Sequence, residues 1–156
     1  MKILRYGAAT LGLLIVVLVY LAPIGPLPGF FIGGVATEVP AVWEDTNDLH
    51  EVKLRVDGIF PRVVTIWMVQ LDNQLYVIGG AENTWVSMLD EGGPVKLRIT
   101  DATYDLFATR ISEEQIQVAR AYHEKYREDY PDIIEGMGSP DEMLAGIIVY
   151  RLAREA

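Results

Sequence analysis

The stretch RVVTIWMVQLDNQLYVIGGAENTW, from Arg62 to Trp85, decides most of the fold. Residues 62–71 are dense in β-branched and aromatic side chains, which is typical of a strand with both faces covered. Asp72-Asn73 suits a two-residue turn, and residues 74–80 form the returning strand. After Gly79-Gly80, either Asn83 or Thr84 is placed to cap a short helix. The stretch predicts a β-hairpin that leads directly into a helix.

The rest of the C-terminal part adds four strands and further helix. Residues 51–58 and 95–100 alternate apolar and polar side chains, as half-buried strands do, and Asp101-Ala102 turns the second of these into a hairpin partner. A capping box at Ser112–Gln115 predicts a helix that reaches Tyr130, Ser139-Pro140 begins another helical turn, and residues 146–152 form a last strand. The order βββαββαβ predicts an α+β fold. It is a small, six-stranded, mostly antiparallel split β-barrel with two or three helices, because closure removes exposed strand edges.

An apolar run precedes the barrel. The sequence YGAATLGLLIVVLVYLAPIG begins at Tyr6 and has about the length that crosses a bilayer. We expect residues 1–24 to hold a cytoplasmic start and one uncleaved transmembrane anchor, in contact with lipid through residues 6–24. A Pro/Gly-rich linker (25–48) and the split-barrel domain (49–156) follow. A cleaved secretory signal and a buried core helix are the alternatives, although a cut after Ala22 would place Pro23 beside the scissile bond.

Charge sets the expected orientation and excludes some partners. Lys2 and Arg5 precede the span, and the first charge after it is Glu38, so the positive-inside rule places the N-terminus in the cytoplasm. In a bacterium the C-terminal domain is then periplasmic, and the protein is a single-pass inner-membrane protein. All 22 acidic residues but only 11 of the 13 basic ones lie from Glu38 onward, a balance of −11 that disfavours nucleic acid. The absence of Cys excludes disulfides and thiolate metal sites, and neither His50 nor His123 has a metal-binding spacing, so we expect no metal.

In the order and residue composition of its strands, the sequence resembles the pyridoxamine 5′-phosphate oxidase-like split-barrel superfamily. This superfamily includes a flavin- or deazaflavin-dependent nitroreductase and quinone reductase branch. The matching segments are RVVTIWMVQLDNQLYVIGG, NTWVSML, PVKLRITDATYDLFATRI and GIIVYRL. The resemblance implies a cofactor, FMN or a deazaflavin, near a set of residues on the first hairpin and the helix after it. These are Arg62, Thr65, Trp67, Gly79, Gly80, Asn83 and Thr84. Trp85 stands where the family has a cation near the helix start, and no catalytic residue can be named.

Two functions follow from these observations. The first is a membrane-anchored, flavin-binding oxidoreductase that reduces a quinone or another lipophilic acceptor at the membrane surface, either as a homodimer or within a larger membrane complex. The second is a cofactor-free accessory or interaction subunit of a membrane protein complex, suggested by Arg62 being the only cation between Arg55 and Lys96. Binding of another small ligand, such as haem, is a further alternative. Whether the protein is an enzyme stays open at this point, because in flavin reductases the cofactor carries the chemistry.

Overall fold

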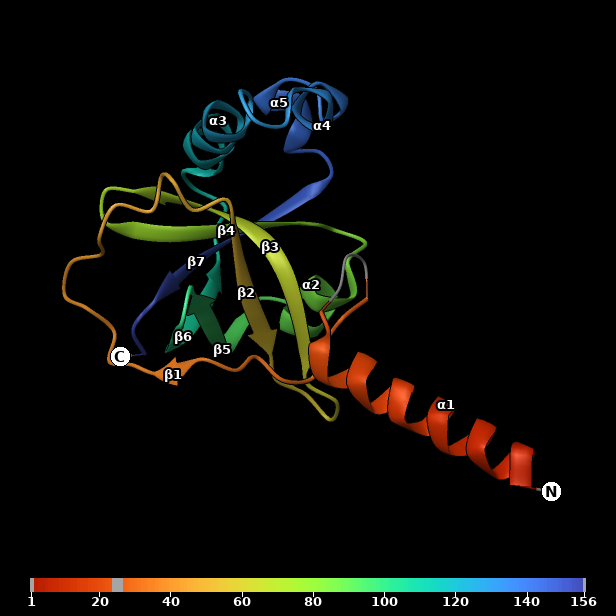
Figure 1. Cartoon of the computed structure of the whole chain (residues 1–156). Helices are drawn as coiled ribbons and strands as arrows, with labels where there is room; N and C mark the ends of the chain where they lie inside the picture. Colours follow the sequence, from red (N-terminus) through yellow and green to blue (C-terminus); the bar gives the residue numbers. More distant parts are fainter. Residues whose placement is uncertain (1, 24–26, 156) are drawn as a thin grey trace.

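The computed structural model describes residues 2–23 and 27–155 of the chain (Figure 1). Its strands are β1 (Val35–Ala36), β2 (Glu51–Val56), β3 (Arg62–Leu71), β4 (Gln74–Gly80), β5 (Gly92–Ile99), β6 (Ala102–Arg110) and β7 (Ile147–Ala153). Its helices are α1 (Lys2–Leu21), α2 (Thr84–Leu89), α3 (Gln115–Tyr126), α4 (Pro131–Gly136) and α5 (Pro140–Met143).

Strands β2 to β7 form the predicted six-stranded antiparallel barrel. The sheet runs in the order β6-β5-β2-β3-β4-β7, and an additional pairing of β6 with β7 closes it. The hairpin between β3 and β4 places Met68 opposite Val77, and its turn residues Asp72 and Asn73 both have positive φ angles, as a tight hairpin turn needs. The short strand β1 pairs in parallel with β6 and was not predicted.

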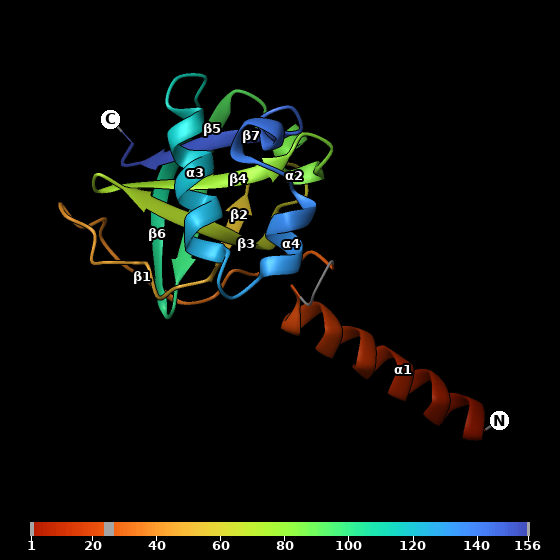
Figure 2. The same cartoon turned by 90° about the horizontal axis from the view of Figure 1, so that it is seen from above.

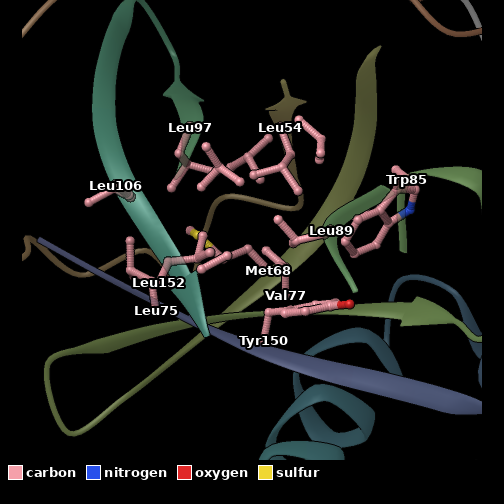
Figure 3. Close-up of a cluster of buried hydrophobic side chains, with 14 of the residues drawn as sticks. Leu54, Met68, Leu75, Val77, Trp85, Leu89, Leu97, Leu106, Tyr150 and Leu152 are labelled. Atoms are coloured by element: carbon pink, nitrogen blue, oxygen red, sulfur yellow. The ribbon is translucent and has the colours of Figure 1, made fainter. Parts of the chain in front are cut away.

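The barrel is filled by side chains from strands β2 to β7, and residues of α2 pack into the same cluster (Figure 3). Leu54, Leu75, Val77 and Leu97 are fully buried, and Trp85 and Leu89 from α2 pack into the same cluster. The alternation of apolar and polar residues in β2 explains how this strand contributes to the core. Val52, Leu54 and Val56 face inward, and the residues between them do not. The hydrophobic pattern therefore specifies the register of the barrel.

A second core lies outside the barrel, where α3, α4 and α5 cover the outer face of β3, β4 and β7 (Figure 2). Val69 and Tyr76 point outward from the hairpin and pack under Val118 and Tyr122 of α3. Because both faces of the hairpin are covered, its continuous apolar sequence is accounted for.

The helical region differs from prediction in two respects. Helix α3 ends at Tyr126, and Pro131 starts the separate helix α4. The predicted capping box at Ser112–Gln115 is wrong, because α3 begins only at Gln115, after Glu114 in a left-handed conformation, and the Gln115 side chain donates a hydrogen bond to the Ile111 carbonyl. A capping box is present instead at α5, where the Ser139 hydroxyl and the Glu142 backbone and side chain bond reciprocally.

Helix α1 covers most of the predicted anchor and projects away from the barrel (Figure 1). Its apolar side chains from Leu11 to Leu18 are largely exposed. No helix in the described part of the chain is both long and apolar enough for a membrane crossing. This finding gives the predicted crossing no support, and anchoring stays a prediction. Residues 1 and 24 of the predicted anchor, and 25 and 26 of the linker, lie outside the described residues.

Candidate functional site

A cavity of about 530 Å³ lies between the barrel and its helical cover. Strand β3 supplies one wall, the end of β4 and the start of α2 a second, and helices α3 to α5 the third. The lining residues are Thr65, Ile66, Trp67, Ile78, Gly80, Asn83, Trp85, Tyr122, Ile133, Met137, Glu142, Met143, Gly146 and Ile147. Most of these side chains are apolar or aromatic, and the volume is within the range of small-molecule sites.

One wall of the cavity is a stack of aromatic rings. Trp67 from β3 lies face to face with Tyr126 of α3, with ring centroids 4.3 Å apart and planes 15° apart. The buried Tyr126 hydroxyl accepts a hydrogen bond from the Met68 amide at 3.0 Å and lies 2.8 Å from the Met68 carbonyl oxygen. Lys125 donates to the same Met68 carbonyl at 2.9 Å. These contacts hold α3 against β3 and fix the ring plane of Trp67.

Tyr122 places a hydroxyl group on this aromatic wall. Its side chain is buried, its ring centroid is 5.7 Å from that of Trp67, and its hydroxyl makes no hydrogen bond to any described residue. Burial, and secondarily the nearby Tyr126, raises the pKa of Tyr122 well above its usual value. The hydroxyl therefore stays protonated at any physiological pH and is available to donate a hydrogen bond to a ligand.

A second cavity, of about 360 Å³, adjoins the first and contains Arg62. The two share Thr65, Ile66, Asn83 and Trp85, while Leu27 and Pro28 of the linker wall the second on its outer side. The Nε atom of Arg62 is buried and has no hydrogen-bond partner in the described structure. A buried donor without a partner costs about 1–3 kcal/mol, more when charged, so its position is notable. Arg62 is also a lining residue of the second cavity, so a guanidinium is available there to pair with an anionic group.

Six of the seven predicted site residues line these two cavities. Thr65 and Asn83 line both, Trp67 and Gly80 line the first, and Arg62 and Thr84 line the second. Gly79 lines neither, because Trp85 and Val86 pack directly over it. A Cβ atom at position 79 would lie 2.2 Å from Cζ2 of Trp85 and 2.4 Å from Cγ2 of Val86. Gly79 thus provides room for the helix α2, rather than a cradle for a ligand.

The charge of the site is mixed. Among the described residues, Arg62 is the one cation that lines the two cavities, whereas Glu82 lines the second and Glu142 the first. Hydrogen bonds from the Ser139 hydroxyl and amide lower the pKa of Glu142, so this carboxylate stays ionised near neutral pH. Within the described residues, no group of three or more His, Cys, Asp or Glu is placed to hold a metal ion.

Sequence reasoning missed the helical side of the cavity. Tyr122 lies on a helix whose apolar spacing is typical of ordinary packing, and nothing in the local sequence signals that Ile133, Met137 and Met143 line a cavity. Tyr76 of β4 packs in the outer core, away from the cavity, with its hydroxyl 3.4 Å from a Glu114 carboxylate oxygen. These positions depend on how α4 and α5 return across the sheet.

The closed six-stranded barrel, with helices over one face and a ligand-sized cavity beneath them, defines a split β-barrel protein of the α+β class. The chain belongs to the bacterial family DUF2255, described as uncharacterized protein conserved in bacteria, whose model matches residues 41–147. A comparison with curated proteins finds no significant match.

Solved structures share the fold at low sequence identity. The conserved hypothetical protein Rv2991 from Mycobacterium tuberculosis matches with a TM-score of 0.52 and 17% identity, over 71% of this chain and 76% of that one. HutZ, the haem storage protein from Vibrio cholerae, matches with a TM-score of 0.51 and 17% identity, over 70% and 85%. A Listeria innocua protein whose description proposes a pyridoxamine 5′-phosphate oxidase has a TM-score of 0.50 and 18% identity, over 70% and 86%. The predicted resemblance to this superfamily is confirmed at the level of the fold.

Proposed function

We propose that this protein binds a flat, aromatic cofactor with an anionic group, and that the cofactor is of the flavin class, FMN or a deazaflavin. The observation that carries the proposal is the junction of the two cavities. The first cavity, walled by Trp67 and Tyr122, shares lining residues with a second cavity that Arg62 lines. A planar ring system with a phosphate tail has the matching polarity, because guanidinium groups pair well with phosphate oxygens.

The residues at the junction have separable roles in this proposal. Arg62 would hold the phosphate, and the Asn83 side chain, which lines both cavities, is positioned to bond a polar edge of the ring system. The protonated Tyr122 hydroxyl would donate a hydrogen bond inside the first cavity, and α3 to α5 supply one side of that cavity. A bound flavin supplies hydride or electron transfer, while the protein supplies position and electrostatics.

The acceptor that we propose is a quinone or another lipophilic molecule reached at a membrane surface. Two features support this. The first cavity is lined mainly by apolar side chains, and α1 carries a run of exposed apolar residues from Leu11 to Leu18 that water disfavours. Anchoring by this N-terminal segment, with the barrel on the periplasmic side, is part of the same proposal.

A cofactor-free accessory subunit is the second candidate, and the charge of the site favours it. Glu82 and Glu142 outnumber Arg62 among the residues that line the two cavities, in a domain with a strong negative balance. A phosphate with about two negative charges near neutral pH meets only one guanidinium there. In this case the barrel would bind a partner chain in a membrane complex.

Titration of the full chain, purified in mild detergent, with FMN, riboflavin and a deazaflavin separates the two candidates. Riboflavin lacks the phosphate, so the loss of affinity in Arg62→Gln should be about tenfold or more for FMN and small for riboflavin. Arg120→Gln, an exposed cation on α3, is the matched control and should bind both as the parent does. A colourless protein that takes up none of the three ligands would refute the flavin proposal, and co-purification of fixed partner chains would favour the second candidate.

A further inference from the structure

Five exposed apolar side chains gather at the end of the barrel where α1 joins it, and we call them the apolar rim. Three come from the linker and two from the loop between β2 and β3: Leu27, Phe30, Phe31, Ile59 and Phe60. Ile59 is 95% exposed and Phe60 is 76% exposed, which is unusual for residues of this size. Phe30, Ile59 and Phe60 line one hollow of about 460 Å³, so the two segments meet in space.

The apolar rim is held firmly by the barrel. Gly29 and Val63 exchange two backbone hydrogen bonds of 2.8 Å, which join the linker to the start of β3. Further along the linker, Arg98 donates to the Ile32 carbonyl at 3.0 Å and the Thr103 hydroxyl donates to the Gly33 carbonyl at 2.6 Å. The exposed phenylalanines therefore keep a defined position relative to the sheet.

The end of α1 lies directly against the same surface. A Cβ atom at Gly29 would lie 2.5 Å from the Ala22 carbonyl oxygen, so the backbone just after α1 is in contact with the rim segment. Figure 1 shows the β2–β3 loop at the barrel end from which α1 emerges. The apolar rim thus lies next to the C-terminal end of α1.

Charge separates this end of the molecule from the rest. The domain from Glu38 onward has a balance of −11, yet residues 27–37 and 58–64 contain no Asp or Glu. Asp57, next to the loop, is paired with Arg55 at 2.8 Å, and Glu82 is the carboxylate that lines the second cavity together with Leu27 and Arg62. Arg62 is the charged residue within the rim segments, and Lys2 and Arg5 are the charges within residues 1–37. The rest of the acidic domain repels an anionic lipid surface more strongly than the rim segments do.

We propose that the apolar rim rests in the interfacial zone of a lipid bilayer, with Ile59, Phe60 and Phe31 inserted among the headgroups. The protruding loop tip favours lipid over a protein partner, because a fluid surface accommodates separate projecting side chains without a complementary shape. This contact does not require α1 to cross the membrane. It orients the barrel so that the hollow beside Arg62, lined by Phe30 and Phe60, opens toward the bilayer. The inference deepens the proposed function by identifying lipid as the source of the lipophilic acceptor.

Depth measurement on the full chain tests the proposal, and the natural absence of Cys allows single-site labelling. Phe60→Cys and, as a control, Glu124→Cys on the exposed side of α3 are labelled with a small fluorophore and reconstituted with phosphatidylcholine–phosphatidylglycerol vesicles. We expect a lipid-borne quencher to act several-fold more strongly on position 60 than on position 124, and iodide to show the reverse. Equal access of iodide to both positions refutes the proposal. Protection of position 60 from both quenchers indicates an interface between copies, and also refutes it.

A binding measurement provides a second criterion. Replacing both Ile59 and Phe60 by Ser should lower the partition constant of the full chain onto these vesicles by about tenfold. Two large apolar side chains then no longer contribute their transfer free energy. Val42→Ser removes an apolar side chain of similar exposure, 71%, and should bind as the parent does. Unchanged partition of the double variant overturns the proposal. Flavin titration can fail while these measurements succeed, so the two proposals are distinguished.

Discussion

Replacement of Gly79 by Ala is the sharpest test of how the candidate site is built. The added Cβ would lie 2.2 Å from Cζ2 and 2.8 Å from Cη2 of Trp85, and 2.4 Å from Cγ2 of Val86. Ordinary carbon contacts are about 3.5–4.0 Å, so Trp85 and Val86 must each move by about 1 Å or more. Both are buried in the barrel core, and overpacking of this kind costs about 1–3 kcal/mol. We expect a value near the upper end, because the indole ring and the strand are both rigid.

Urea unfolding followed by Trp fluorescence and far-ultraviolet circular dichroism measures this cost on the detergent-solubilised chain. At about 3 °C per kcal/mol, a cost of about 2–3 kcal/mol corresponds to a fall of roughly 6–9 °C in the melting temperature, which heating with the same two signals measures. Gly80→Ala is the matched control, since its Cβ would lie 3.5 Å from Nδ2 of Asn83 in ordinary contact. The control should change stability by less than about 0.5 kcal/mol. If Gly79→Ala were as stable as Gly80→Ala, the assignment of Gly79 to packing under α2 would be refuted.

Two further predictions concern the tyrosines of α3. Tyr126→Phe should cost about 1–3 kcal/mol in the unfolding free energy, because the Met68 amide loses its bond to the buried hydroxyl, whereas Tyr122→Phe should cost under about 0.5 kcal/mol. Equal losses in the two variants, by the same urea titration, would contradict these assignments. The second prediction is for alkaline pH. Burial raises the pKa of both tyrosines, so the folded chain keeps protons that the unfolded chain releases from about pH 10 upward. The stabilisation is complete below about pH 10 and is lost as the pH rises further. In Tyr122→Phe, the unfolding free energy should fall less steeply with pH above about pH 10. A fall as steep as in the parent would show that Tyr122 does not contribute to this pH dependence.

The local sequence pattern was sufficient to predict most strands and turns of the barrel. The alternation in residues 51–58, the paired turn residues Asp72-Asn73 and the Gly-Gly exit each restrict the backbone within a few residues, and the structure confirms all three features. Local pattern failed at the start of α3, where a sequence that fits a capping box adopts a left-handed turn at Glu114 instead. The helix start there is set by packing of Val118 and Tyr122 on the barrel, which the signal in residues 112–115 does not encode.

The candidate site was predictable on one side only. The first hairpin and the start of α2 carry Arg62, Thr65, Trp67, Gly80, Asn83 and Thr84, which a resemblance in sequence order was enough to indicate. The opposite wall comes from α3, α4, α5 and the start of β7. No sequence motif marks those positions. Apolar side chains at helical spacing give the same sequence pattern whether they pack against a strand or line a cavity next to it.

The sequence by itself determined the strand order, the hairpin turns, the acidic character of the domain and the apolar N-terminal segment, since each depends on neighbouring residues or on composition. Only the tertiary structure decided that Trp85 covers Gly79, that Arg62 Nε is buried without a partner, and that Phe60 lies beside Phe30. Those relations join segments that are distant in the chain or oppose one another across a turn. They arise from the closure of the barrel and the packing of helices upon it, which no short stretch of residues specifies.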